Sequence, residues 1–403
     1  MNIAIIGGGA AGFFAAITVK ENYPNYNVTI FEKTNKLLSK VQISGGGRCN
    51  VTNACGSIDE FVEAYPRGKR LLQKLMYRFS NKDTMHWFIT RGVPLVTQPD
   101  NCVFPQSQDS ESIIDCFFEH ASKLKINIKL TKTIKEISKK GDKICIMFDN
   151  IKNDNLFDKV IVATGGSSKR DSYQWLVNIG HTINEPVPSL FTFKMPKSDI
   201  TNLQGIVIPQ AICSIQSTNL ISKDALLITD WGFSGPAILK LSSYGARILS
   251  DMNYCFILRI NWSGIKDQSQ IKSFLLNIKN ENSSKNLINF RPYDFPTRFW
   301  SYLINRANVN PNKKWAEISQ QELNKIINVI SNDVYKITGR NKFKEEFVTC
   351  GGVSLNNINP NTLESKVFKN MYFAGEVLDI DGITGGFNLQ AAWTTGYIAG
   401  LLK

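Results

Sequence analysis

Long apolar runs, paired cysteines and clustered histidines are all missing from this sequence of 403 residues. No apolar run reaches the roughly 18 residues that a membrane-spanning helix needs, so none is predicted. Eight cysteines are too sparse for a disulfide scaffold, and none forms a C-x-x-C pair. The three histidines, His86, His120 and His181, lie far apart, so zinc spacing is missing and we expect no metal site.

A secretory signal is also missing from the N-terminus. MNIAIIGGGAAGFFAAI has no basic residues before its apolar run, and its glycines follow a pattern, so we interpret it as part of the fold. We therefore expect a cytoplasmic protein. With 43% hydrophobic and 20% charged residues, the chain is typical of a globular protein of two or three domains. The oligomeric state stays open.

Acidic residues are fewer than basic ones, 34 against 47, which gives a net charge of +13. A polyanionic partner such as RNA would explain this excess, and so would a composition rich in Lys, Asn and Ile. PRGKRLLQKLMYRF (66–79) predicts a helix with Arg67, Arg70, Lys74 and Arg78 on one face. This basic face fits RNA binding and simple solvation about equally well.

A strand, a glycine turn, a helix and a second strand are predicted at the start of the chain. NIAII and VTIFE are short apolar runs, and the segment between them has apolar residues at helical spacing after its glycines. This order is a βαβ unit. Within it, Gly7, Gly9 and Gly12 satisfy the pattern G-x-G-x-x-G in the context that dinucleotide binding requires.

Each glycine of this motif has a physical role. Gly7 permits the sharp turn out of the strand, Gly9 lets a pyrophosphate approach the backbone, and Gly12 lets the helix pack closely on the strand. The N-terminus of the helix offers free N–H groups to the phosphates. Glu32, 20 residues after Gly12, can accept hydrogen bonds from ribose hydroxyls and would repel a 2′-phosphate. The motif therefore predicts FAD or NAD rather than NADP in this pocket.

The rest of the chain suggests an interrupted dinucleotide-binding domain. DKVIVATGG reads as a buried strand, and NMYFAGE repeats its ending in glycine near the C-terminus. Between them, short alternating runs predict an antiparallel sheet or small barrel, followed by a helical stretch. We predict an FAD-binding domain of residues 1–187 plus 345–403, a β-barrel-like inserted domain of 188–263 plus 332–344, and a helical subdomain of 264–331.

A second helix N-terminus is predicted near the end of the chain. An apolar strand ends at Gly375 and Glu376, and Gly385 and Gly386 open an apolar helix. If the first helix holds a pyrophosphate, the electron-rich edge of a flavin ring suits the second, because the helix dipole there favours the reduced ring. Glu376 could accept hydrogen bonds from a ribityl chain.

The stretches GGGAAG, SGGGRCNVTN, VIVATGG, GFSGPAIL, VTCGGVSL and YFAGEVLDIDGITGG together resemble the BaiN/RdsA-type flavoproteins, over the whole chain. The resemblance implies an α/β fold: a Rossmann-like FAD domain built from both chain ends and related to the two-dinucleotide-binding fold, with a β-barrel-like and a small helical domain. It also implies that SGGGRCN lies along the FAD. The residues it places at FAD are Gly7, Gly9, Ala10, Ala11, Gly12, Glu32, Lys33, Lys40, Ser44, Gly45, Gly46, Gly47, Arg48, Asn50, Ile134, Gly165, Gly375, Glu376, Gly385, Gly386, Phe387 and Asn388.

Cys49, inside this cradle, permits two interpretations. Disulfide reductases of related fold use two cysteines four residues apart, whereas five residues separate Cys49 from Cys55. A small residue packed beside a glycine loop is therefore favoured over a redox pair.

Family members are linked to reduction of steroid-like enones, oxidation of aminoacetone and reduction of uridine to dihydrouridine in ribosomal RNA. The resemblance thus implies an FAD-dependent oxidoreductase, with NAD(P)H as a transient donor because no second G-x-G-x-x-G marks a nicotinamide domain. Arg48, Thr349 and Asp381 are the candidate catalytic residues. A small-molecule oxidoreductase and a non-catalytic RNA-binding flavoprotein are the alternatives.

Overall fold

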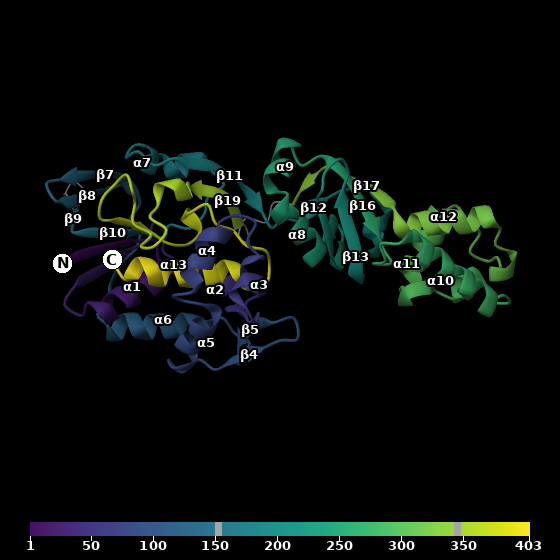
Figure 1. The fold of residues 1–403 in the computed structure, drawn as a ribbon, viewed down its shortest axis with the longest axis horizontal. Coiled ribbons are helices and arrows are strands. Elements are labelled where there is room, and N and C mark those ends of the chain that lie inside the picture. Colours follow the sequence, from purple (N-terminus) through teal and green to yellow (C-terminus); the bar gives the residue numbers. More distant parts are fainter. Residues whose placement is uncertain (150–154, 342–347) are drawn as a thin grey trace. The chain divides into compact units, whose positions relative to one another are not determined.

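A computed structural model describes residues 1–149, 155–341 and 348–403 (Figure 1). The chain forms two compact units. Unit 1 comprises Met1–Ser189 and Phe343–Lys403, and unit 2 comprises Leu190–Lys342. The division into three domains predicted from the sequence stays a prediction.

A parallel sheet of five strands forms the centre of unit 1, in the order β20-β10-β1-β2-β6. It confirms the predicted βαβ unit, since β1 pairs with β2 in parallel register across a glycine turn and a helix. The last strand in the sequence, β20, joins the same sheet through β10. The bounds are β1 Asn2–Ile6, α1 Ala10–Asn22, β2 Asn27–Phe31, β6 Asn127–Lys129, β10 Lys159–Val162 and β20 Met371–Phe373.

Helix α13 (Phe387–Gly400) lies beside α1, so the two ends of the chain share one core (Figure 1). Both helices are buried around most of their circumference, which explains their nearly continuous apolar sequences. Two glycines allow the close approach. A Cβ at Gly396 would lie 2.8 Å from the carbonyl oxygen of Ala11, and one at Gly400 would lie 2.8 Å from that of Ala15.

Smaller sheets and short helices surround this centre. Strands β3, β5 and β4 form one sheet, β7, β8 and β9 a second, and β11 pairs with β19 in a third. The bounds are α2 Ser39–Ile43, β3 Thr52–Asn53, α3 Ile58–Val62, α4 Lys69–Met76, α5 Asn81–Ile89, β4 Leu95–Thr97, β5 Cys102–Pro105, α6 Glu111–Lys123, β7 Ile134–Lys140, β8 Lys143–Phe148, β9 Asn155–Phe157, α7 Gln174–Val177, β11 Ile183–Ser189 and β19 Val348–Val353.

Unit 2 contains an antiparallel sheet in the order β17-β16-β13-β14-β15-β12-β18, and the helices α10, α11 and α12 lie between β16 and β17 in the sequence. The sequence analysis did not predict α8 and α9, which interrupt the predicted run of strands. Pro236 at the first turn of α8 is a favoured helix start, because a proline there loses no helical hydrogen bond. The bounds are β12 Phe193–Lys194, β13 Val207–Ile215, β14 Ile221–Thr229, β15 Gly232–Ser234, α8 Pro236–Tyr244, α9 Ala246–Asp251, β16 Phe256–Asn261, α10 Gln268–Glu281, α11 Thr297–Arg306, α12 Gln320–Ser331, β17 Asp333–Ile337 and β18 Gly339–Arg340.

The length and polarity of the helices show whether any of them could cross a membrane. Within the described ranges, no helix combines the length and the apolar character that crossing a bilayer requires.

Candidate cofactor site

The three glycines of the N-terminal motif occupy three different environments. A Cβ at Gly7 would lie 2.2 Å from the carbonyl oxygen of Ala163, and one at Gly12 would lie 2.0 Å from that of Gly7. Both glycines are therefore required by the packing of the protein itself. A Cβ at Gly9 would meet no protein atom within 4 Å. This open space above the backbone is what the approach of a pyrophosphate needs.

Helix α1 begins directly at this open space. Gly9 is its N-cap residue, no side chain caps the first N–H groups, and no acidic residue lies in the first turn. Ala10 and Ala11 form that turn, so small side chains border the N–H groups. An uncapped helix N-terminus with free donors and partial positive charge is suited to bind a phosphate.

Glu32 follows the second strand and faces the glycine turn. One carboxylate oxygen accepts a hydrogen bond from the backbone N of Gly8 (2.9 Å), and the other accepts from the backbone N of Thr34 (2.9 Å). These contacts orient the carboxylate, and its remaining lone pairs can accept from ribose hydroxyls. Lys33 next to it is exposed. Ile134 begins β7 two residues after Lys132, whose backbone N donates to the carbonyl of Glu32, so its segment runs close by.

The loop after α2 is a left-handed turn built from three successive glycines. The φ angles are 59° at Gly45, 70° at Gly46 and 84° at Gly47, values at which a side chain is strained. The backbone N of Cys49 donates to the carbonyl of Ser44 (2.9 Å) and closes the turn. Cβ atoms at Gly46 and Gly47 would meet nothing within 4 Å, so this loop also offers accessible backbone.

The cysteine of this loop is a packing residue. Cys49 is fully buried, and burial raises the pKa of its thiol to about 12. Neither Cys49 nor Cys55 forms a disulfide. Because the thiolate is the reactive form, a thiol with so high a pKa is unsuited to redox exchange at neutral pH.

Polar side chains of the loop are held by the protein. The Arg48 guanidinium lies over the Phe104 ring at 4.2 Å, and its Nε donates to the carbonyl of Gly45 (3.2 Å). The Ser44 hydroxyl donates to the carbonyl of Val41 (2.9 Å). With the amide orientation that satisfies its neighbours, Asn50 accepts from the backbone N of Gly386 (3.2 Å). This contact joins the glycine loop to the start of α13.

The C-terminal part of the site lies against the N-terminal part. A Cβ at Gly375 would lie 2.8 Å from the Cβ of Ala11, so this turn packs on the start of α1. Glu376 accepts from the Lys40 ammonium (2.6 Å) and from the backbone N of Thr349 (2.7 Å). Glu376, the predicted ribityl contact, thus pairs in the protein alone with Lys40, for which the resemblance implies a contact with the pyrophosphate. A Cβ at Gly165 would meet nothing within 4 Å.

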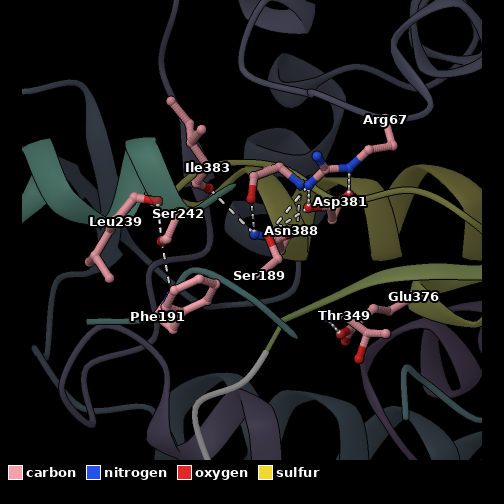
Figure 2. A network of polar contacts seen from close by, with 11 residues as sticks. Arg67, Ser189, Phe191, Leu239, Ser242, Thr349, Glu376, Asp381, Ile383 and Asn388 are labelled. Atoms are coloured by element: carbon pink, nitrogen blue, oxygen red, sulfur yellow. Dashed lines mark hydrogen bonds and ion pairs between the residues drawn. The ribbon is translucent and has the colours of Figure 1, made fainter. Parts of the chain in front are cut away.

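Asp381 forms a buried ion pair (Figure 2). Its carboxylate is fully buried, binds the Arg67 guanidinium and accepts from the Ser189 hydroxyl (2.8 Å). Burial raises the pKa of Asp381, while the cation beside it acts in the opposite direction. The structure corrects the predicted basic face in two members. Arg78 lies beyond the end of α4 at Met76, and its guanidinium donates to the backbone carbonyl of Asn361 (2.5 Å). Arg67 precedes the helix, which begins at Lys69, and faces Asp381 instead of sharing the exposed surface of Arg70.

The start of α13 is braced from within. Asn388 accepts from the backbone N of Gly382 (2.8 Å) and donates to its carbonyl (2.9 Å), as Figure 2 shows in part. The backbone carbonyl of Phe387 accepts from the Tyr65 hydroxyl (2.7 Å). Gly385 and Gly386 adopt φ angles of 119° and 89°, and no side chain caps the helix. These contacts fix the loop that presents a second uncapped helix N-terminus.

These observations define a class of protein. One Rossmann-like unit contains two uncapped helix N-termini, a carboxylate after the second strand and glycine positions open to a ligand. Together these features fit an extended dinucleotide such as FAD. Bound FAD would supply two-electron chemistry. In the described ranges, no group of three or more His, Cys, Asp or Glu side chains could hold a metal ion.

The chain belongs to the HI0933-like family, because the model of the HI0933-like protein Rossmann domain matches residues 1–402. It is 25% identical over 406 residues to a 3-dehydro-bile acid delta(4,6)-reductase of Clostridium scindens, covering 99% of this chain and 98% of the relative. It is 26% identical over 412 residues to a ribosomal RNA dihydrouridine synthase of Haemophilus influenzae, covering 98% and 97%.

Solved structures agree on the fold. A 3-ketosteroid delta1-dehydrogenase from Sterolibacterium denitrificans matches with a TM-score of 0.53 and 11% identity, covering 99% of this chain and 98% of the other. The predicted fold class and family are confirmed. The family and its relatives support the predicted assignment as an FAD-dependent oxidoreductase. The individual FAD contacts and catalytic residues stay predictions.

Proposed function

We propose that this protein uses FAD and NAD(P)H to reduce an activated carbon–carbon double bond, and that its substrate is a uridine of ribosomal RNA. The observation that carries the cofactor part is the open space at Gly9, at the uncapped start of α1. The relatives support the chemistry, since a bile acid reductase and an RNA dihydrouridine synthase both match nearly the whole chain. The same proposal places the protein in the cytoplasm.

Both named activities share one reaction. A hydride adds to the β-carbon of an enone-like system, and a proton adds to the neighbouring carbon, so two hydrogens saturate the double bond. NAD(P)H is the proposed reductant and leaves as NAD(P)⁺. The net charge of +13 favours RNA over a small substrate such as a bile acid, because lysine and arginine neutralise the many phosphates of an RNA chain. A small-molecule enone is the second candidate, since the bile acid reductase covers 99% of this chain.

We assign the chain's residues to this reaction as follows. The backbone at Gly9 and the start of α1 hold the pyrophosphate, and Glu32 orients the ribose. Arg48 and Thr349 stay candidates for contacts at the reacting end. The carboxylate of Asp381 is already engaged by Arg67 and Ser189, so we propose that it positions the loop before α13 rather than transferring a proton.

The first experiment is mass spectrometry of ribosomal RNA from a deletion strain. We expect one dihydrouridine to disappear and to return when the wild-type gene is supplied. Unchanged RNA would remove the RNA substrate from the proposal. Purified protein that is colourless and cannot be reconstituted with FAD would contradict the cofactor assignment as well. Turnover of a steroid-like enone together with unchanged RNA would support the second candidate.

A further inference from the structure

The outer face of α4 combines unpaired positive charge with an exposed aromatic ring. Leu71, Leu72, Leu75 and Met76 are buried on the inner face. Arg70, Lys74 and Tyr77 follow at i, i+4 and i+7, so they share the opposite face. Tyr77 is 70% exposed, the most of any aromatic side chain in the described part of the chain. We call these three residues the α4 stripe.

Three acids near α4 are engaged by residues other than Arg70 and Lys74. Glu63 pairs with Lys69 (2.5 Å), Asp59 accepts from Gln73 (2.7 Å), and Asp381 pairs with Arg67. Within the described residues, Arg70 and Lys74 have no acidic partner. Two cations beside an exposed ring therefore remain available to a ligand from solvent.

The stripe starts beside the cofactor site. A Cβ at Gly68, where φ is 79°, would lie 2.6 Å from the side chain of Ile380. Arg67 and Asp381, the sequence neighbours of Gly68 and Ile380, form the ion pair drawn in Figure 2. The N-terminus of α4 is thus fixed to the loop that leads to Gly386, and a ligand lying along the stripe extends from that loop.

We infer that the α4 stripe binds a single-stranded segment of the RNA substrate, with Arg70 and Lys74 on phosphates and Tyr77 stacked on an unpaired base. This inference rests on the proposed function. The three side chains span about 10 Å along the helix, the rise of about three nucleotides in one strand. The Tyr77 ring is 70% exposed and therefore accessible from solvent, and unpaired bases stack on such rings. A protein partner would more often require a larger apolar patch than one ring.

The test measures binding of a labelled single-stranded uridine-containing RNA to FAD-loaded full-length protein at several salt concentrations. Replacing both cations (Arg70→Gln with Lys74→Gln) should weaken binding and make the slope of log K against log salt shallower by about 1.4. The Lys123→Gln, Lys125→Gln pair on and just after α6 removes the same charge from exposed positions and should leave the slope nearly unchanged. Equal slopes for both pairs would overturn the inference.

Tyr77 separates base stacking from general attraction to polyanions. Tyr77→Ala should weaken single-stranded RNA binding about 5- to 150-fold, while Tyr77→Phe keeps the ring and the affinity. Neither variant should change heparin binding or flavin content. Wild-type affinity in Tyr77→Ala, or an equal loss for heparin, would overturn the stacking role. If dihydrouridine formation is confirmed and the variants bind RNA normally, only this inference fails. If the wild type binds no RNA, the RNA substrate fails with it.

Discussion

Alanine substitutions at the three motif glycines should separate the packing of the protein from the binding of its cofactor. Gly9 has φ −96° and ψ −169°, which any residue can adopt, and a methyl group there meets no protein atom within 4 Å. Gly12→Ala would bring a Cβ to 2.0 Å from the Gly7 carbonyl oxygen. The same change at Gly7 meets Ala163 at 2.2 Å and adds a φ of 112°.

These distances determine how much each substitution should change the free energy of unfolding and the affinity for FAD. Gly9→Ala should change the free energy of unfolding of the apoprotein by less than about 1 kcal/mol, with a small gain from the stiffer unfolded chain. Gly12→Ala should destabilise by about 3 kcal/mol, because a contact at 2.0 Å forces the backbone apart. The effect of Gly9→Ala on FAD affinity should be large although its effect on stability is small. Gly9→Ala should raise the Kd at least tenfold, about 1.4 kcal/mol, because its methyl occupies the space of the pyrophosphate.

Urea denaturation of the apoprotein and titration with FAD measure the two effects. Gly339→Ala in β18 is the matched control, since its Cβ also meets nothing within 4 Å but lies in unit 2. It should change neither stability nor FAD affinity by much. Wild-type FAD affinity in Gly9→Ala, or a loss of stability as large as that of Gly12→Ala, would refute the role assigned to this open space.

Three further predictions concern charged and titratable groups of unit 1. Arg67→Ala leaves Asp381 buried without its cation and should cost about 3–5 kcal/mol in urea denaturation; an unchanged midpoint would contradict this. Lys40→Met removes an ion pair whose lysine side chain is 50% exposed, so apoprotein stability should fall by less than about 1 kcal/mol while FAD affinity drops. Equal FAD affinity would argue against a pyrophosphate contact. Burial lowers the pKa of His181 from 6.5 to about 4, so its contribution to stability is complete above pH 6.5 and decreases by up to about 3 kcal/mol as pH falls to 4. The urea midpoint of His181→Gln should depend less on pH over this range, and parallel curves would refute the assignment.

Local patterns were sufficient to predict the main elements of unit 1. The apolar runs and glycines at the start of the chain predict β1, α1 and β2 to within a residue or two, because helix and strand periods are short-range signals. The helix predicted over 66–79 is shorter, Lys69–Met76, since Gly68 adopts a left-handed conformation that starts it late. The amphipathic pattern alone does not mark that start.

Partnerships across the chain were not predictable from the sequence. Arg67 looked like one member of a basic face, but its partner Asp381 is 314 residues away. Asn388 was predicted to contact the cofactor, which stays a prediction, and its amide is bonded to the backbone of Gly382 in the loop before its helix, a contact that the sequence analysis did not predict. Both contacts depend on how the loop before α13 folds back, which no local period encodes. For the ion pair, the sequence offered one signal, which is the acidic residue Asp381 beside the glycine-rich segment that opens α13.

The position of the predicted cofactor residues constrains how substrates are chosen. All of them, from Gly7 to Asn388, lie in unit 1. Relatives named for a bile acid and for ribosomal RNA are similarly close to this chain, at 25% and 26% identity over nearly its whole length. A glycine turn that holds a pyrophosphate makes the same contacts whatever is reduced, so it cannot distinguish these substrates. Discrimination must come from surfaces that the cofactor does not need, and the exposed cations and ring of α4 satisfy that condition, because removing them leaves every proposed FAD contact in place.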